Sequence, residues 1–315
     1  MGTGPIFVFR LSCRDIIRLR HTSGLDMPAT LWPAPAKLNL FLHVLGRRDD
    51  GYHALQTVFQ LVDLEDRLTF TPRADGAVRR RSANADVEEA NDLSVRAASL
   101  LKARSGCAAG VDIAVEKRIP MGGGLGGGSS DAATTLRALN RIWALGLDVD
   151  ALAAIGLELG ADVPVFVRGR SAFAEGVGER LEPVELDSPW YLIVDPGCSV
   201  STARVFAEPA LTRDSTPLRI RDLAPPGGGP LTARSLLRSA RNDCEPVVRA
   251  LYPQVDAALD WLAERGDARM TGTGACVFAP FEDRDAAHSV LEALPSEWRG
   301  CVARGMNRSA LLSLV

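Results

Sequence analysis

The stretch that decides the fold reads Pro120-Met121-Gly122-Gly123-Gly124-Leu125-Gly126-Gly127-Gly128-Ser129-Ser130-Asp131. A predicted strand, 111–115, leads into it, and a predicted helix from about residue 129 to residue 143 follows it. Glycine loses more conformational freedom on folding than any other residue, so ordering this run is costly. We therefore expect its backbone to pass close to a ligand and to direct N–H groups at it. At a helix N-terminus such a ligand is usually an anion, most often phosphate.

Three other interpretations of the glycine run fit less well. A flexible linker rarely separates a strand from a well-patterned helix. A P-loop ends in Gly-Lys-Ser or Gly-Lys-Thr, and the run contains no lysine. Gly122, Gly124 and Gly127 do fit G-x-G-x-x-G. A dinucleotide-binding fold, however, also needs a strand ending in an acid about 20 residues later, where the predicted helix is still running.

The helix predicted after the run has one apolar face. Ala132, Leu136, Leu139 and Trp143 recur at helical spacing, and polar residues fall elsewhere. The oxygens of residues 129–131 are predicted to cap the first turn.

Composition indicates an ordinary globular protein that is long enough for two domains. The 315 residues are 46% hydrophobic and 24% charged, with a net charge of −3. That balance gives no general attraction to nucleic acid or to acidic membranes, and no apolar run reaches the length of a membrane span. We expect neither nucleic acid nor a membrane as a partner. Lysine occurs only at Lys37, Lys102 and Lys117, so a lysine within a motif carries extra weight.

The six cysteines are scattered, with no C-x-x-C pair and no Cys/His ligand spacing. We expect free thiols in a reducing compartment, the cytoplasm, and neither a disulfide framework nor a metal site built by the protein.

Residues 1–27 differ from the rest of the chain, because an apolar tetrapeptide is followed by several arginines and few acids. The order of charge and apolar residues does not fit a secretory signal. A transit peptide and an over-long start, with Met27 as the initiator, both remain open, and the second is preferred. This extension is excluded from the fold.

Residues 32–45 predict a strand with two distinct faces. Ala36, Leu38 and Leu40 point to one side, which is expected to face the core, while Lys37 and Asn39 share the other. A lysine in a strand is most often a solvated or edge-guarding charge.

Further strands are predicted at 57–62, 67–71, 172–177, 190–194 and 277–279 and near 301–304. Helices are predicted at 93–102, from Asp148 or Asp150 through 159, around 255–262 and near 286–294. Asp162 follows a helix stop and precedes an apolar segment, where an aspartate is as often a cap as a functional residue. This alternation indicates an α+β or mixed α/β protein of two domains.

Three segments together resemble the signature motifs of the GHMP kinases, the galactokinase, homoserine kinase, mevalonate kinase and phosphomevalonate kinase superfamily. They are Pro35-Ala36-Lys37-Leu38-Asn39-Leu40, the run Gly122 to Ser130, and Thr271-Gly272-Thr273-Gly274-Ala275. Within the superfamily, four more segments look like those of the 4-diphosphocytidyl-2-C-methyl-D-erythritol kinases. These are Gly51-Tyr52-His53, Leu159-Gly160-Ala161-Asp162-Val163-Pro164, Ala174-Glu175-Gly176-Val177-Gly178-Glu179 and Asn242-Asp243-Cys244-Glu245. The resemblance covers residues 33 to about 307.

The resemblance implies an α+β fold in two domains. Residues 28–185 would form an ATP-binding domain like domain 2 of ribosomal protein S5, and 186–315 a ferredoxin-like C-terminal domain that contributes to substrate binding. It also implies ATP-dependent phosphorylation of the 2-hydroxyl of 4-diphosphocytidyl-2-C-methyl-D-erythritol, in the non-mevalonate route to isoprenoid precursors. The enzyme would be a monomer or a weak homodimer.

Lys37 and Asp162 match the catalytic pair of the family. The resemblance implies that Asp162 accepts the proton of the attacking hydroxyl or orients it, while Lys37 holds Asp162 ionised and neutralises charge on the transferring phosphoryl group. Phosphoryl transfer has a loose transition state, so positioning and electrostatics carry most of the rate enhancement.

Other residues match binding positions of the family. The ATP-binding positions are Asp92, Lys117, Pro120, Met121, Gly122, Gly123, Gly124, Leu125, Gly126, Gly127, Gly128, Ser129 and Ser130. The substrate-binding positions are Asn39, Tyr52, His53, Thr202 and Phe206, with the aromatic residues on the cytosine ring. Mg²⁺ is expected with ATP, held partly by phosphates and water, with Ser129 or Ser130 as its protein contact. Asp92 departs from the family, which usually has Asn there, so the amide donor that contacts the nucleotide is lost.

Three rival functions are alternatives to this interpretation. Another GHMP small-molecule kinase is disfavoured by the Gly51-Tyr52-His53 segment, and comparing substrates in an ADP-release assay would decide. A non-catalytic ligand-binding protein on the same fold could dispense with Lys37 and Asp162, yet both are present. A dinucleotide oxidoreductase lacks the expected acid, and NADH binding would be needed to support it.

Overall fold

The computed structural model describes residues 30–81, 87–223 and 230–315. The expectations for residues 1–27 therefore lie outside the described residues. The strands are β1 Trp32–Arg47, β2 His53–Arg73, β3 Val78–Arg80, β4 Gly110–Glu116, β5 Ala172–Gly176, β6 Arg180–Pro183, β7 Trp190–Asp195, β8 Arg269–Met270, β9 Val277–Phe281 and β10 Arg299–Met306. The helices are α2 Leu93–Ser105, α3 Gly127–Ile142, α4 Val149–Leu157, α5 Val163–Arg168, α6 Thr202–Ala207, α7 Ala233–Ser239, α8 Glu245–Leu251, α9 Pro253–Ala263 and α10 Arg284–Glu292. Short 3-10 turns lie at Glu89–Asn91, Ile220–Asp222 and Ala310–Ser313.

Strand β2 is the spine of the sheet. It pairs antiparallel with β1 along one edge, and its other edge carries β5, then β10, then β4. The two strands predicted at 57–62 and 67–71 are thus one continuous strand. The acidic residues between them hid this continuity, and one of them, Asp66, is fully buried.

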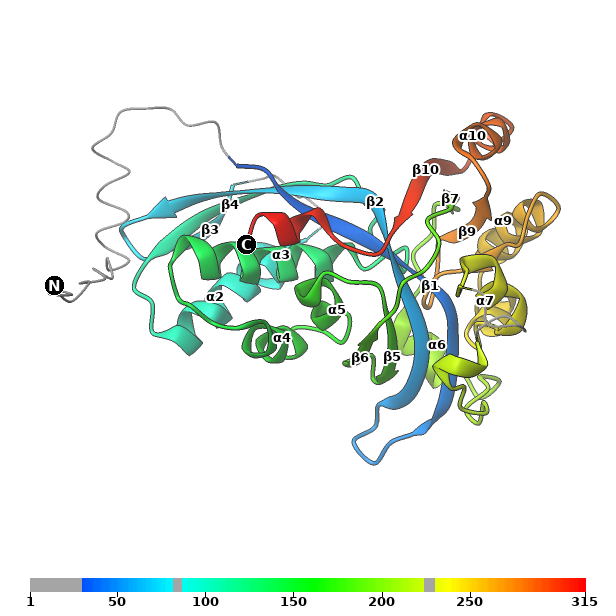
Figure 1. Cartoon of the computed structure of the whole chain (residues 1–315), viewed down its shortest axis with the longest axis horizontal. Coiled ribbons are helices and arrows are strands. Elements are labelled where there is room, and N and C mark those ends of the chain that lie inside the picture. Colours follow the sequence, from blue (N-terminus) through cyan, green and yellow to red (C-terminus); the bar gives the residue numbers. More distant parts are fainter. Residues whose placement is uncertain (1–29, 82–86, 224–229) are drawn as a thin grey trace, which may run out of the picture.

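Strand β10 joins the two halves of the molecule into a single ten-stranded sheet. Gly305 and Met306 pair with β2, and residues 299–304 pair with β7, giving the order β3-β4-β2-β10-β7-β9-β8. Helices α2 to α5 cover the N-terminal part of this sheet, and α7, α9 and α10 lie around the C-terminal part (Figure 1). The mixture of helices with a largely antiparallel sheet confirms the α+β class. The domain boundary at 185/186 stays a prediction.

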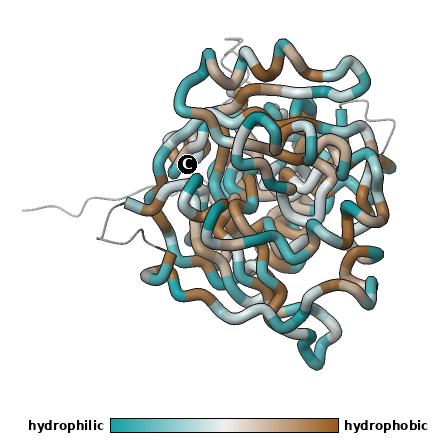
Figure 2. Tube along the Cα trace, turned by 90° about the vertical axis from the view of Figure 1, so that its right-hand side faces the viewer, coloured by the Kyte–Doolittle hydropathy of each residue, from teal (hydrophilic) through white to brown (hydrophobic). Residues whose placement is uncertain are grey.

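Each half has its own apolar core. One core gathers residues of β2, β4 and helices α2 to α5, including Leu101, Leu136 and Trp143. The other gathers β7, β9, α8 and α9, including Leu192 and Leu259. Many hydrophilic positions lie on the peripheral loops (Figure 2).

Helix α3 has the predicted apolar face, since Ala132, Leu136 and Leu139 are fully buried. The predicted capping by residues 129–131 is wrong. Gly126 occupies the N-cap with a φ of 74°, the helix starts two residues earlier than predicted, and no described side chain caps it. Because Gly126 adopts a left-handed backbone conformation, the helix already begins at Gly127, before Ser129 and Ser130.

The face of β1 that carries Lys37 and Asn39 is buried, whereas a strand lysine is usually solvated. Lys37 is 2% exposed and Asn39 is 3% exposed. The reason is that the glycine run and the turn at 271–275 cover this face. A buried lysine needs partners, which are described below.

We expect Leu136→Ala to lower the free energy of unfolding by about 2 to 5 kcal/mol, because it removes a fully buried side chain and leaves a cavity. Urea unfolding followed by circular dichroism measures the change. Leu157→Ala is the matched control at a position 39% exposed, and should cost about 0.5 kcal/mol or less. Equal losses in the two variants would contradict the assigned core.

Candidate active site

A cavity of about 1530 Å³ opens between the glycine run, the centre of β1 and the C-terminal half. Asp92 and Lys117 line one end of it, and Tyr52, His53 and Phe206 line the other. The remaining predicted residues that line it are Lys37, Asn39, Pro120, Met121, Gly122, Gly123, Gly124, Leu125, Gly126, Gly127, Gly128, Ser129, Asp162 and Thr202. Ser130 is the one predicted residue outside this lining. Its hydroxyl is buried and has no hydrogen-bond partner among the described residues.

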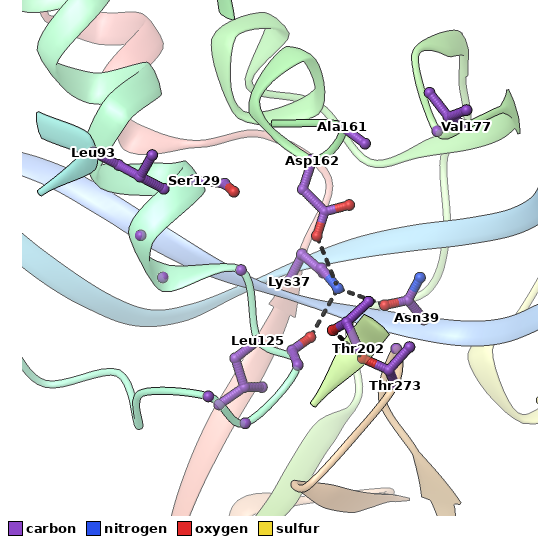
Figure 3. A pocket seen from close by; sticks show the side chains of 18 of the residues that line it. Lys37, Asn39, Leu93, Leu125, Ser129, Ala161, Asp162, Val177, Thr202 and Thr273 are labelled. Carbon is purple, nitrogen blue, oxygen red and sulfur yellow. Dashed lines mark hydrogen bonds and ion pairs between the residues drawn. The ribbon is translucent and has the colours of Figure 1, made fainter. Parts of the chain in front are cut away.

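The Lys37 ammonium lies at the centre of the cavity, held by oxygens from three segments (Figure 3). Its Nζ donates to Asn39 Oδ1 at 2.5 Å and to the carbonyl of Gly124 at 2.8 Å. Asp162 Oδ2 is 3.4 Å away, and the ring of Phe59 lies beneath with its centroid at 5.4 Å. These partners make burial of the charge tolerable and fix its position.

Asp162 occupies the N-cap position of α5 but does not cap the helix. No described backbone N–H of the first turn donates to its side chain, and Pro164 removes one of the candidate donors. The carboxylate instead points toward Lys37, 3.4 Å from its Nζ, and is one-third exposed (Figure 3). The cap interpretation of this residue is therefore not supported, and the carboxylate is accessible to a ligand.

The glycine run makes close contacts with protein as well as lining the cavity. A Cβ on Gly124, whose φ is +76°, would lie 2.3 Å from the carbonyl oxygen of Thr271, and one on Gly123 would lie 2.4 Å from Cys276 Sγ. The run thus packs directly against the turn at 271–275. Glycine is required at these two positions by the approach of the C-terminal half.

The N-terminus of α3 opens into the cavity with its first turn uncapped. The amides of Gly127, Gly128 and Ser129 have no partner within the helix, and the helix dipole favours negative charge in front of them. This geometry suits a phosphate group.

Lys117 is shared by two buried carboxylates behind the glycine run. Its Nζ lies 2.5 Å from Asp66 Oδ2 and 2.8 Å from Asp131 Oδ2. Asp66 also accepts from the backbone N–H groups of Arg118 and Ile119. Burial raises the pKa of Asp131 to about 7, Asp66 adds to the shift, and the Lys117 ammonium opposes it. The cluster ties β2, the entry to the run and α3 together.

At the opposite end of the cavity, His53 stacks on Phe206 with ring centroids 4.9 Å apart. Arg213 Nε donates to His53 Nε2 at 3.2 Å and also holds the carbonyls of Phe206 and Glu208. Burial, together with the charges of Arg213 and Arg47, lowers the pKa of His53. A neutral imidazole that accepts at Nε2 carries its proton on Nδ1. Tyr52 lies at the rim, 66% exposed.

Two predicted ligand residues are partly engaged with protein. Thr202 shares a hydrogen bond of 2.9 Å with Thr273, which also lines the cavity (Figure 3). Asp92 caps α2 by accepting from the Ser94 N–H at 2.9 Å, and its second oxygen lies 3.1 Å from Arg80 Nη1. Carboxylate at this position thus has a structural use in helix capping and ion pairing.

Several residues that shape the site were given no role in the prediction from sequence. Thr57 binds Asn39, and Arg213 binds His53. Asn242 lies in a segment quoted for the resemblance, but it received no role. Its amide donates to the carbonyls of Met270 and Gly272 at 2.8 Å each and so fastens the turn at 271–275. Its place within that segment was the available sequence signal.

Comparison with known families now assigns the class. The GHMP kinases N terminal domain matches residues 92–170, and the GHMP kinases C terminal domain matches residues 227–300. The first match spans the glycine run and Asp162, which form the cavity described above. The chain is a GHMP kinase.

Similar proteins identify a more specific family within the GHMP kinases. The chain is 58% identical over 283 residues to a 4-diphosphocytidyl-2-C-methyl-D-erythritol kinase of Alkalilimnicola ehrlichii, covering 89% of this chain and 92% of the relative. It is 57% identical over 285 residues to one of Halorhodospira halophila, covering 90% and 95%. The chain belongs to the 4-diphosphocytidyl-2-C-methyl-D-erythritol kinase family.

Solved structures agree with this assignment. A crystal structure of 4-(cytidine 5'-diphospho)-2C-methyl-D-erythritol kinase has a TM-score of 0.73 at 36% identity, covering 88% of this chain and 99% of that one. The mevalonate kinase of Methanococcus jannaschii has a TM-score of 0.65 at 16% identity, covering 90% and 100%, which shows a common fold. The predicted GHMP kinase fold is confirmed.

The described residues contain neither a membrane-spanning helix nor a cluster of metal ligands. None of the helices there combines the length and the apolar character that crossing a membrane requires. Nor do three or more His, Cys, Asp or Glu side chains gather there as a metal-binding group.

We expect Asp131→Asn to stabilise the protein more at pH 8 than at pH 5.5, by a difference of about 2 kcal/mol. The pKa of this carboxyl is about 7 in the native state and 3.8 at its ordinary value, so the native state holds a proton that the unfolded chain releases. Stability of the parent protein therefore falls as the pH rises through this window, and asparagine removes that loss. Urea unfolding at both pH values measures it. Asp150→Asn, on an exposed carboxylate, is the control. A difference that does not depend on pH would contradict the assignment.

Proposed function

We propose that this kinase transfers the γ-phosphoryl group of ATP to the 2-hydroxyl of 4-diphosphocytidyl-2-C-methyl-D-erythritol. ADP and the 2-phosphate are the products. The observation that supports the site assignment is the Lys37–Asp162 pair, 3.4 Å apart and facing the uncapped N-terminus of α3 within one cavity. Family membership supports the choice of substrate.

Asp162 orients the attacking hydroxyl and accepts its proton. Its carboxylate is exposed to the cavity and is not used for capping, so it can accept a hydrogen bond from the alcohol. General-base help of this kind is typically worth about 10²–10⁴-fold. Lys37 pairs with Asp162 and places a fixed positive charge where negative charge is transferred.

The glycine run binds the triphosphate. The free amides of Gly127, Gly128 and Ser129 direct N–H groups into the cavity, and the dipole of α3 adds to their attraction for phosphate. Lys117 and Asp92 lie at the adenine end.

The site can hold Mg²⁺ through phosphate oxygens of the nucleotide, water and one protein hydroxyl. A bound Mg²⁺ neutralises phosphate charge in phosphoryl transfer and retains several water ligands. Of the two serines predicted to contact it, Ser129 lines the cavity and Ser130 is buried outside the lining, so we assign the contact to Ser129. The described residues offer no group of three His, Cys, Asp or Glu that would hold the ion without the phosphates.

The cytidine end is formed by the rings of Tyr52, His53 and Phe206. The exposed Tyr52 ring gains burial when a base stacks on it, and the Nδ1–H of His53 is a donor for the polar edge of the base. We infer that Asn39 and Thr202, which line the same cavity, contact the methylerythritol unit.

We place the enzyme in the cytoplasm, as a monomer or a weak homodimer. Free thiols at all five described cysteines fit a reducing compartment. Oligomeric state is a prediction that size-exclusion chromatography with light scattering tests directly.

A coupled ADP-release assay with a substrate panel tests the reaction. We expect turnover with 4-diphosphocytidyl-2-C-methyl-D-erythritol and less than about 1% of that kcat/KM with homoserine or mevalonate, since neither carries a base for the His53 end of the cavity. One polar recognition group of this kind can be worth about 10⁴-fold in discrimination. Preference for either alternative would replace the proposed substrate with that of another GHMP kinase.

Asp162→Asn should lower kcat by about 10²–10⁴-fold, because the amide keeps the shape of the side chain but accepts no proton. KM for both substrates should change much less. Asp150→Asn is the matched control, since that carboxylate lies on α4 with a side chain 75% exposed and pairs with Arg168. A loss below tenfold in Asp162→Asn would support a binding protein and count against the mechanism.

A further inference from the structure

A shift in the pairing of β1 with β2 lies beside the Lys37 ammonium. Asn39 is opposite Phe59 and Leu42 is opposite Thr57, so two residues of β1, Leu40 and Phe41, face the single residue Val58. Such a β-bulge leaves backbone groups outside the ladder and re-aims nearby side chains, often next to an active site.

The carbonyl of Phe41, one of these two bulge residues, has a side-chain partner. It accepts a hydrogen bond from the hydroxyl of Thr57 at 2.5 Å. Thr57 is 3% exposed and lies on β2 between β1 and β5. A threonine hydroxyl has one proton, so the proton of Thr57 is committed to Phe41.

In its second hydrogen bond, the Thr57 oxygen can therefore act only as an acceptor. Its partner is Asn39 Nδ2 at 2.9 Å. This fixes the orientation of the Asn39 amide, because the NH₂ group must face Thr57 and the oxygen must face the other way. That oxygen is the one that accepts from Lys37 Nζ at 2.5 Å.

We propose that Thr57 is a positioning residue for phosphoryl transfer, which sets the Lys37 ammonium through the amide of Asn39. The chain of bonds runs from the Phe41 carbonyl to Thr57, from Thr57 to Asn39, and from Asn39 to Lys37. A flipped amide would turn its NH₂ group toward the ammonium, and a donor there repels the cation. The inference rests on the proposed role of Lys37.

Thr57→Val tests the proposal with an isosteric side chain that has no acceptor. We expect kcat for the cytidine substrate to fall at least tenfold, while KM for ATP and for the alcohol stays within about threefold. Thr57→Ser keeps the hydroxyl, and its kcat should lie within about threefold of the parent enzyme. A serine variant as slow as the valine variant would overturn the proposal.

Thr134→Val is the matched control for the loss of a buried hydroxyl. Thr134 is 1% exposed on α3, and its hydroxyl donates to another β1 carbonyl, that of Pro33, at 3.0 Å. Its removal should lower the melting temperature as Thr57→Val does, but leave kcat within about twofold. An equal loss of kcat in Thr134→Val would show that general destabilisation, not positioning, slows the Thr57 variant.

A second readout needs no substrate. The sequence has three lysines, so brief acetylation followed by peptide mass spectrometry reports Lys37 against Lys102, whose ammonium binds the Gly76 carbonyl in another part of the protein. Thr57→Val releases the Asn39 amide, whose oxygen is then no longer held against Lys37 Nζ, and should raise the labelling of Lys37 relative to Lys102 at least threefold. Thr134→Val should leave the labelling unchanged. Unchanged labelling together with unchanged kcat would overturn the proposal. If the parent enzyme did not turn over the cytidine substrate, the proposed function would fail, and the labelling would still test the positioning.

Discussion

The architecture depends on the burial of one cation, the Lys37 ammonium. An unpaired charge at this depth would be very costly, so the fold has to bring oxygens to it from separate parts of the chain. β1 supplies the Asn39 amide, the glycine run supplies the Gly124 carbonyl, and the start of α5 supplies Asp162. Because these segments meet at the ammonium, the phosphate-binding loop and the proposed base are held at a fixed separation. The contacts that stabilise the buried ammonium therefore also fix the positions of the proposed catalytic groups.

The same region shows why the glycine run is so long. Part of it provides the amides at the start of α3, and part of it lies against the turn at 271–275 with no room for a side chain. That turn is fastened in its own domain by Asn242. The run thus connects the nucleotide end of the cavity with the C-terminal half, and its composition reflects two constraints that act on neighbouring residues.

Short local patterns predicted the parts of the site that lie within a motif. The glycine run was predicted from its own residues, whereas Lys37 and Asp162 were predicted only through the resemblance to the GHMP kinases. The structure places all three around one cavity. Residues that act through tertiary contacts were not predictable. Thr57 looks like any strand threonine, and Asp66 looks like a break in a strand. It is buried only because Lys117 and two backbone N–H groups reach it from about fifty residues further along. The capping prediction at α3 failed for a related reason, since Gly126 closes the turn before the serines.

Strand β10 has a consequence for how the molecule is made. Residues 299–306 are inserted between β2 and β7, so they complete a sheet whose central strand, β2, is synthesised more than 200 residues earlier. During translation part of the β2 edge stays unpaired until residues 299–306 have left the ribosome, and exposed edges of this kind favour association with other chains. Assembly of the sheet is thus a late event in biosynthesis, and a nascent chain that stalls before residue 299 leaves the ribosome as a species prone to aggregate.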